Sequence, residues 1–361
     1  MPPEDSAPED PVPEDSAPGD GESRVEETPV DELDASVDAP AAEVVLAEIA
    51  SDAPLELPRL RALAGPSDTI VAGFVELWPR VPAERRREAL ALLQQLSEED
   101  PTLDFHRIHL TAFRDADPAT RILAIRGIVE EETVEYMRLL AAQLRDDGEP
   151  SVRAELADAL GVWVLSMEFE LIDEDDGDLL TSALREAVED VNEEEEVRGR
   201  ALEALGASSE EEVKELIGES YELGSHRMRV AALRAMGRNA SDDWLPVLLF
   251  NFDDDDAEIR AIAAVAAGQL LMEDAVPPLT QLIDDTDEDV QVAAITAIGE
   301  IGDDECERIL NRLVEESRES HIRDAASDAL AQLQVLTMDV EQGRGTLEFD
   351  EQSTVEDNDG E

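Results

Sequence analysis

A thirteen-residue segment recurs along this chain at nearly constant spacing. "DEDVQVAAITAIG" at 287–299 has counterparts in "DAEIRAIAAVAAG" from residue 256 and "EEEVRGRALEALG" from residue 194. Further copies begin at residues 117, 149, 225 and 319, so successive copies start 32, 45, 31, 31, 31 and 32 residues apart. A fixed period of this size is typical of a solenoid, in which each unit buries its apolar faces only against its neighbours. The one long step, from 149 to 194, predicts an insertion of about 14 residues near "VWVLSMEFELIDEDDGD".

Each copy has the pattern of an amphipathic helix. In the copy from 256, Ile259, Ala263, Ala266 and Ala267 fall on one face at 100° per residue. Such small residues let neighbouring helices approach closely, and the glycine that follows marks a crowded contact or a helix exit. That glycine recurs at Gly161, Gly206, Gly237, Gly268 and Gly299. A second apolar helix lies between copies, so each unit is predicted to be a helical hairpin.

Composition favours an all-α chain and limits its chemistry. Aromatic residues are only 3% of the sequence, so the core must be built from Ala, Leu, Ile and Val, a set that suits packed helices better than sheets. The single cysteine, Cys306, excludes an internal disulfide and is expected to be a small buried residue at the start of a helix. No signal peptide or membrane-spanning run is evident, so we expect a cytoplasmic protein.

The chain is strongly acidic. It holds 91 Asp and Glu against 28 Lys and Arg, a net charge of −63, which argues against binding nucleic acid or anionic membranes. Two explanations stay open. One is a halophilic-like composition, supported by the presence of a single lysine, Lys214. The other is a cationic partner.

The acidic, Pro-rich residues 1–40 and the acidic residues 338–361 are predicted to be disordered tails. They would flank a repeat domain at residues 41–337.

The repeat itself resembles a known family. The pattern D-x-x-V-R-x-x-A-x-x-A-L-G, preceded by P-x-L-x-x-L, resembles HEAT repeats, and the 31-residue period is similar to the short HEAT-like variety shared with phycobilisome lyases. The resemblance covers roughly residues 55–336 and implies a right-handed α-solenoid of about seven or eight hairpins. It also implies a structural ladder of acidic residues and arginines along the stack. The arginines concerned are Arg153, Arg198, Arg229, Arg260 and Arg323. Gln291 departs from the pattern and would weaken one rung.

The sequence offers no catalytic constellation. His106 and His109 could share a helix face, but two imidazoles alone make an incomplete metal site. No His is followed by Glu, the dipeptide with which a HEAT-like hydroxylase binds iron, and no GxxxxGK[ST] phosphate loop is present. We therefore predict no catalytic residue, no metal and no cofactor, and we regard an enzymatic activity as the less favoured possibility.

The positions two, five and nine residues after each repeat arginine should point away from the core. They hold Arg200, Glu203, Arg234, Arg238, Ile262, Val265, Gln269, Thr296 and Glu300. Three arginines beside two exposed aliphatic residues suit the centre of an interface. We predict that Arg200, Arg234, Arg238, Ile262 and Val265 bind a partner with acidic and aliphatic groups. The alternative is an ordinary solvated face whose arginines pair with local carboxylates. The basic run Arg85, Arg86 and Arg87 is expected to be such a solvated face.

These observations favour a non-catalytic scaffold or adaptor that binds another protein or peptide. Its oligomeric state is left open. One alternative is a factor of the phycobilisome-lyase type, acting as a chromophore lyase, chaperone or protein-modifying accessory factor; it predicts visible absorbance from a bound chromophore. Another is a solenoid that regulates an enzyme encoded nearby.

Overall fold

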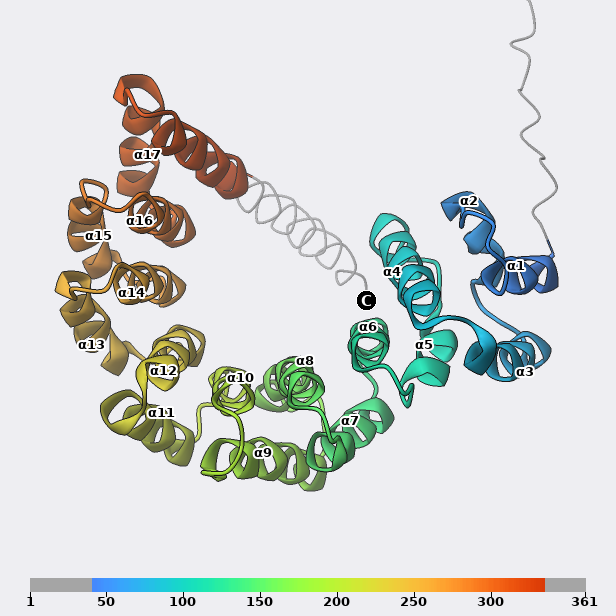
Figure 1. Ribbon diagram of the computed structural model, residues 1–361. Helices are drawn as coiled ribbons and strands as arrows, with labels where there is room; N and C mark the ends of the chain where they lie inside the picture. The colour runs from blue at the N-terminus through green and yellow to red at the C-terminus, as the bar shows by residue number, and fades with distance from the viewer. Residues whose placement is uncertain (1–40, 335–361) are drawn as a thin grey trace, which may run out of the picture. The chain divides into compact units, whose positions relative to one another are not determined.

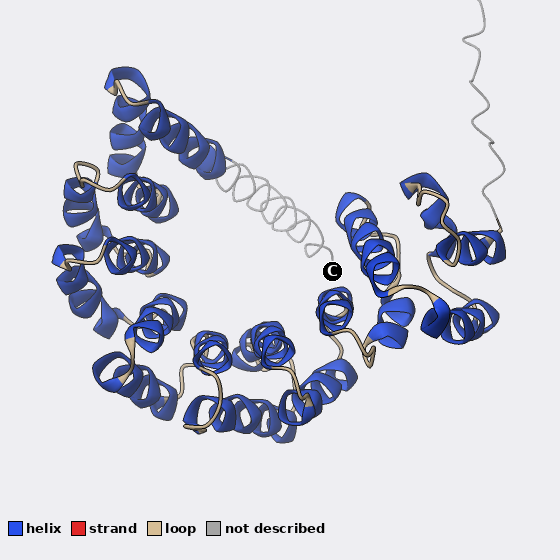
Figure 2. Cartoon of the chain, in the orientation of Figure 1, coloured by secondary structure: helices blue, strands red, loops and turns tan. Residues whose placement is uncertain are grey.

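The structure, a computed structural model, describes residues 41–334. The predicted tails, residues 1–40 and 338–361, lie outside the described residues. Within residues 41–334 every regular element is a helix, as the composition predicts (Figure 2). None of these helices is long and apolar enough to cross a membrane.

The repeat region alternates two kinds of helix. The predicted repeat helices are α6 (Pro118–Val129), α8 (Pro150–Glu168), α10 (Glu195–Leu205), α12 (His226–Asn239), α14 (Ala257–Gln269), α16 (Glu288–Ile301) and a last helix from residue 320 to 334. The helices between them are α7 (Val134–Asp146), α9 (Glu174–Glu189), α11 (Glu211–Leu223), α13 (Leu245–Phe250), α15 (Val276–Leu282) and α17 (Asp304–Glu316). From α8 to α17 these form two parallel rows, so the chain is an all-α solenoid of stacked hairpins (Figure 1).

Shorter elements precede and connect these hairpins. Before the first clear repeat lie α1 (Ala42–Ile49), α2 (Leu57–Leu60), α3 (Asp68–Leu77), α4 (Ala83–Glu99) and α5 (His106–Ala112). Single 3₁₀ turns are η1 (Arg61–Leu63), η2 (Trp78–Arg80), η3 (Asp242–Trp244), η4 (Asn251–Asp253) and η5 (Glu273–Ala275). Prolines stand in the first turns of α13 and α15, where the missing N–H costs nothing.

The apolar stripe predicted from the repeat is the core. Ile259, Ala263, Ala266 and Ala267 are all fully or almost fully buried. The recurrent glycines lie where repeat helices meet: a Cβ on Gly268 would stand 2.6 Å from Cα of Ala297 on the next repeat helix. Backbones can approach this closely only without a side chain between them. The glycines therefore mark close contacts between repeat helices, and Gly206 is also the C-cap residue at which α10 ends.

Candidate functional site

The predicted arginine ladder links consecutive repeats. Arg260 donates Nε and Nη2 to the two carboxylate oxygens of Asp285, at 2.8 and 2.7 Å, and Nη1 to the backbone carbonyl of Asp254, at 2.8 Å. Asp285 in turn accepts from the backbone N–H of Asp287, at 2.9 Å, just before α16 begins. The hydrogen bond from Arg260 holds the pKa of the Asp285 carboxyl below its ordinary value. One arginine thus ties together the turns that begin two successive repeat helices.

The other four predicted ladder arginines differ in their partners: two bind carboxylates and two bind backbone carbonyls. Arg153 binds both carboxylate oxygens of Glu193, at 2.7 Å each, and Arg229 binds Asp254 at 2.7 Å. Arg198 and Arg323 make backbone links, to the carbonyls of Val188 at 2.9 Å and Ser317 at 3.0 Å.

Two further residues, Arg121 and Gln291, occupy the ladder position in their repeats. Arg121, which the sequence analysis did not include, binds Asp147 at 3.0 and 2.8 Å. Gln291 keeps the bond to a backbone carbonyl, that of Asp285 at 2.7 Å, and its side-chain oxygen lies 2.6 Å from Nε2 of His321 on the last helix, where several other repeats have an arginine–carboxylate pair. The acidic partners could have been found from sequence, because Asp115, Asp147, Asp254 and Asp285 each stand six residues before a repeat Arg or Gln.

The three predicted partner-binding arginines all contact one residue, Glu203. Arg200 and Arg234 place Nη1 3.2 Å from the two oxygens of Glu203, and Arg238 donates Nη1 to the Glu203 backbone carbonyl at 3.0 Å. Glu203 was expected to point into solvent, but its side chain is only 4% exposed because these arginines cover it. Asp158 approaches Arg200 more loosely, at 3.6 Å.

The same arginines line two adjoining hollows of about 310 Å³ each. The first is polar: Arg200 and Arg234 lie on it together with Glu195, Glu196, His226 and Glu258. The second is more apolar, and Arg234 and Arg238 border it beside Ile262, Val265 and Gln269. The structure therefore brings all five predicted partner-binding residues to one continuous surface on α10, α12 and α14, with Arg234 shared by both hollows. We call the five residues the arginine–aliphatic surface.

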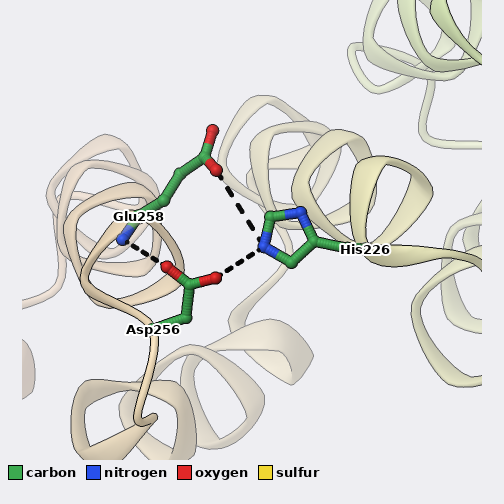
Figure 3. A group of neighbouring side chains, drawn as sticks. All are labelled: His226, Asp256 and Glu258. Carbon is green, nitrogen blue, oxygen red and sulfur yellow. Dashed lines mark hydrogen bonds and ion pairs between the residues drawn. The ribbon is translucent and has the colours of Figure 1, made fainter.

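A cluster of a different kind lies at the edge of the polar hollow. His226 Nε2 stands 2.8 Å from Oδ2 of Asp256 and 3.9 Å from Oε2 of Glu258 (Figure 3). The second Asp256 oxygen accepts the backbone N–H of Glu258 at 3.0 Å. An imidazole and two carboxylates are donors that divalent cations use, and these three groups lie within 4.8 Å of one another. All three are exposed and contact each other, so we interpret them as a polar link between α12 and α14.

His106 and His109 both lie on α5, but only His109 is in the core. His109 of α5 is buried against Gly127 of α6, whereas His106 pairs with Asp104 and, at 3.0 Å, with Glu131. The two imidazole rings therefore lie in different environments, that of His109 in the core and that of His106 beside two carboxylates.

The prediction of a solvated Arg85–Arg87 face was wrong. Arg85 donates to the carbonyls of Glu48, Ile49 and Ala53, next to α1. Arg86 and Arg87 reach forward to the turn before α6, to Asp115 at 2.9 Å and to Asp117 at 3.1 Å. The three side chains join α4 to its two neighbours, which a helical pattern alone could not reveal.

Comparison with known proteins agrees with this architecture. The family model of HEAT repeats matches residues 181–268, 219–290 and 276–335. This part of the chain contains HEAT repeats. HEAT repeats commonly mediate protein binding. No curated protein matches the sequence significantly.

Solved structures with a similar course of the chain are distant. Human deoxyhypusine hydroxylase in complex with glycerol is 19% identical, over 81% of this chain and 98% of that chain, with a TM-score of 0.32. The CpcE–CpcF complex of phycocyanin lyase from Nostoc is 16% identical, over 78% and 97%, with a TM-score of 0.39. YibA of Escherichia coli is 16% identical, over 69% and 98%, with a TM-score of 0.40. Likenesses at this level say nothing about activity.

Proposed function

We propose that this HEAT-repeat solenoid is a non-catalytic scaffold that binds another protein through the arginine–aliphatic surface. The observation that supports the proposal most is the excess of guanidinium groups around one buried carboxylate. Arg200 and Arg234 share the Glu203 side chain, Arg200 also lies 3.6 Å from Asp158, and Arg238 bonds only to the backbone carbonyl of Glu203. In a chain with a net charge of −63, the second hollow is exceptional, because Arg234 and Arg238 line it and no Asp or Glu is among its lining residues.

The arginines keep the capacity to bind a second carboxylate. A guanidinium carries five N–H donors, and the hydrogen bonds described above use only Nη1 of each. The side chains of Arg200 and Arg234 remain 43% and 44% exposed. A partner carboxylate could therefore bind without displacing Glu203, and charge-assisted hydrogen bonds of this kind are strong and directional.

Ile262 and Val265 form the apolar part of the arginine–aliphatic surface, and they favour a partner that brings an apolar side chain. Ile262 and Val265 are only partly buried and lie beside Arg234 and Arg238 in the second hollow. Aliphatic groups bordered by arginines resemble the centre of a protein interface, where apolar contact supplies affinity and charge supplies register. The partner segment is thus expected to present an aliphatic side chain next to an acidic one.

Photo-crosslinking in extracts of the source cells tests the proposal. A benzophenone side chain at position 269, which is Gln269 in the second hollow, should trap a partner protein in the full-length chain. The trap should fail when Arg234→Gln, Arg238→Gln and Ile262→Ser are added. Glu203→Gln belongs in the same variant, because removing the arginines alone would leave a buried charge unpaired.

A matched variant separates the surface from general charge effects. Arg80→Gln and Arg145→Gln remove two arginines that lie elsewhere, on η2 and α7, and should leave the crosslink intact. Equal crosslinking by all the folded variants, or none by the parent chain, would contradict the proposal.

A further inference from the structure

The inserted segment after α8 builds an exposed apolar surface that the stack does not use. Helix α8 has 19 residues, whereas α10, α12, α14 and α16 have 11 to 14. At its extended end, Leu165, Phe169 and Leu171 are 50%, 66% and 72% exposed. We call these three residues the apolar turn. The apolar side chains of the repeat stripe are by contrast almost all buried.

The backbone gathers the three side chains at one place. Leu165 and Phe169 are four residues apart and so lie on the same side of the helix end. The backbone N–H of Leu171 bonds to the carbonyl of Ser166, and that of Glu170 bonds to Met167, both at 2.9 Å. With Glu170 in the left-handed region (φ 56°), this is a Schellman turn, a motif that folds the residue after it back toward the last helical turn. Leu171 is thereby directed back to the end that carries Leu165 and Phe169.

The turn is also anchored rather than loose. Glu168 is the last residue of α8, and its carboxylate accepts the backbone N–H of Ser209 at 2.9 Å. Met167 packs against Gly177 at the start of α9, where a Cβ would stand 3.1 Å from its side chain. The exposed side chains therefore stand on a fixed support, which reduces the entropy lost when a partner binds.

Acidic residues surround the apolar turn. Residues 165–179 contain seven Asp and Glu and no Lys or Arg. Of these, Asp176 is used internally, since Arg138 binds both its oxygens at 2.7 and 2.9 Å. Glu170, Asp173, Glu174 and Asp175 are exposed. The same turn of a second copy, or an anionic membrane, would meet like charge here, whereas a cationic segment would be attracted.

We propose that the apolar turn docks a basic amphipathic segment of another protein, one with aliphatic or aromatic side chains flanked by Lys or Arg. The surface differs from the arginine–aliphatic surface in both place and sign of charge. The two would let the solenoid bind an acidic and a basic partner at once. The proposal does not depend on the function proposed for α10, α12 and α14.

A synthetic amphipathic Leu/Lys peptide, labelled with fluorescein, is a direct probe for the full-length chain. Its dissociation constant is measured by anisotropy at low salt and in concentrated KCl, which screens general attraction to an acidic protein. We expect Phe169→Ser with Leu171→Ser to weaken binding about tenfold or more at both salt concentrations. Glu170→Gln with Glu174→Gln should weaken it at low salt only.

The controls use apolar residues that are just as exposed elsewhere. Val191→Ser with Leu223→Ser removes two such side chains from the ends of α9 and α11 and should leave the affinity unchanged. Circular dichroism verifies that each variant is folded. The proposal is overturned if the wild-type chain does not bind the peptide, or if a peptide with its leucines replaced by serine binds equally well. It is also overturned if the Phe169 and Leu171 variant abolishes self-association of the chain, since the occupant would then be a second copy.

Discussion

At the scale of single residues, burial decides what a titratable group does. His109 is 1% exposed, and neither of its ring nitrogens has a well-aligned hydrogen-bond partner within residues 41–334. Burial lowers its pKa to about 4, with a smaller contribution from the charge of His106, and the Leu123 carbonyl offsets part of the effect. The imidazole is therefore a neutral core side chain at neutral pH.

We predict that His109 makes the protein sensitive to mild acid. In the unfolded chain His109 has the ordinary His pKa of 6.5 and is protonated below that pH. In the folded chain it is protonated only below about pH 4. Stability is therefore lost as the pH falls from 6.5 toward 4, by about 2.5 kcal/mol for this group at pH ~4.5. His109→Leu should remove that loss, as measured by urea unfolding at pH ~7.5 and ~4.5.

The comparison isolates His109 because the other three histidines are present in both proteins. The aspartates of the ladder have lowered pKa values, so they remain charged through most of this window. An equal loss of stability in the variant and the parent would show that His109 is not the acid-sensitive group.

At the scale of helices, two devices hold neighbouring repeats together: close backbone contact at the glycines and the arginine ladder between turns. The first was predicted from the spacing of small residues. For the second, the arginines followed from the family resemblance, but most acidic partners lie in turns 20 to 40 residues away in the chain. Most of these acidic residues recur six residues before the repeat Arg or Gln, but which arginine each one binds depends on the stacking of repeats.

The glycine contact predicts a large effect from a single methyl group. Gly268→Ala would place a Cβ 2.6 Å from Cα of Ala297, so the two helices must separate, at a cost of about 2 kcal/mol. Gly218→Ala in α11 meets nothing within 4 Å and should instead stabilise the chain by about 0.5–1 kcal/mol through helix propensity. Chemical denaturation of both variants measures the difference, and similar effects of the same sign would refute it.

The ladder predicts that one rung is worth far more than a surface ion pair. Arg260→Gln keeps a side chain that can bond the Asp254 carbonyl, as Gln291 does one repeat later with Asp285. It loses the paired bonds to the Asp285 carboxylate, and because both partners are largely buried we expect a cost of about 2 kcal/mol.

Arg80→Gln is the matched control for this prediction. It breaks an ion pair with Glu76 whose side chains are largely exposed, so the free energy of unfolding should hardly change. If the two variants have the same free energy of unfolding, the prediction is wrong, and the ladder only fixes how successive repeats align.

At the scale of the whole molecule, net charge dominates. Residues 41–334, which the structure describes, hold 68 acidic and 26 basic residues, so this part of the chain repels itself. The ion pairs of the ladder act in the opposite direction, but they are partly buried and are screened less by salt.

We predict that KCl stabilises the protein. Raising its concentration from about 0.1 M to 1 M shortens the Debye length from ~10 Å to ~3 Å and weakens the repulsion between exposed carboxylates. The midpoint of thermal unfolding should rise by about 5 °C or more, with choline chloride giving a similar shift if screening is the cause. A midpoint that falls with salt would mean that ion pairs outweigh the repulsion.

The sequence alone determined the architecture of this protein. The period of about 31 residues, the buried stripe and the recurrent glycine are local patterns, and a solenoid repeats the same local contacts from unit to unit. It also determined which arginines and aliphatic side chains could share a surface, because equivalent positions of stacked helices must lie side by side.

Only the tertiary structure decided the surroundings of individual side chains. Glu203 was predicted to be exposed, but Arg234 reaches it from the next repeat and buries it. Arg85–Arg87 were predicted to face solvent, but neighbouring elements supply their acceptors. The apolar turn likewise emerged from the Schellman geometry at the end of α8. Burial and pairing depend on atoms contributed by distant parts of the chain, and a pattern within one repeat holds no record of them.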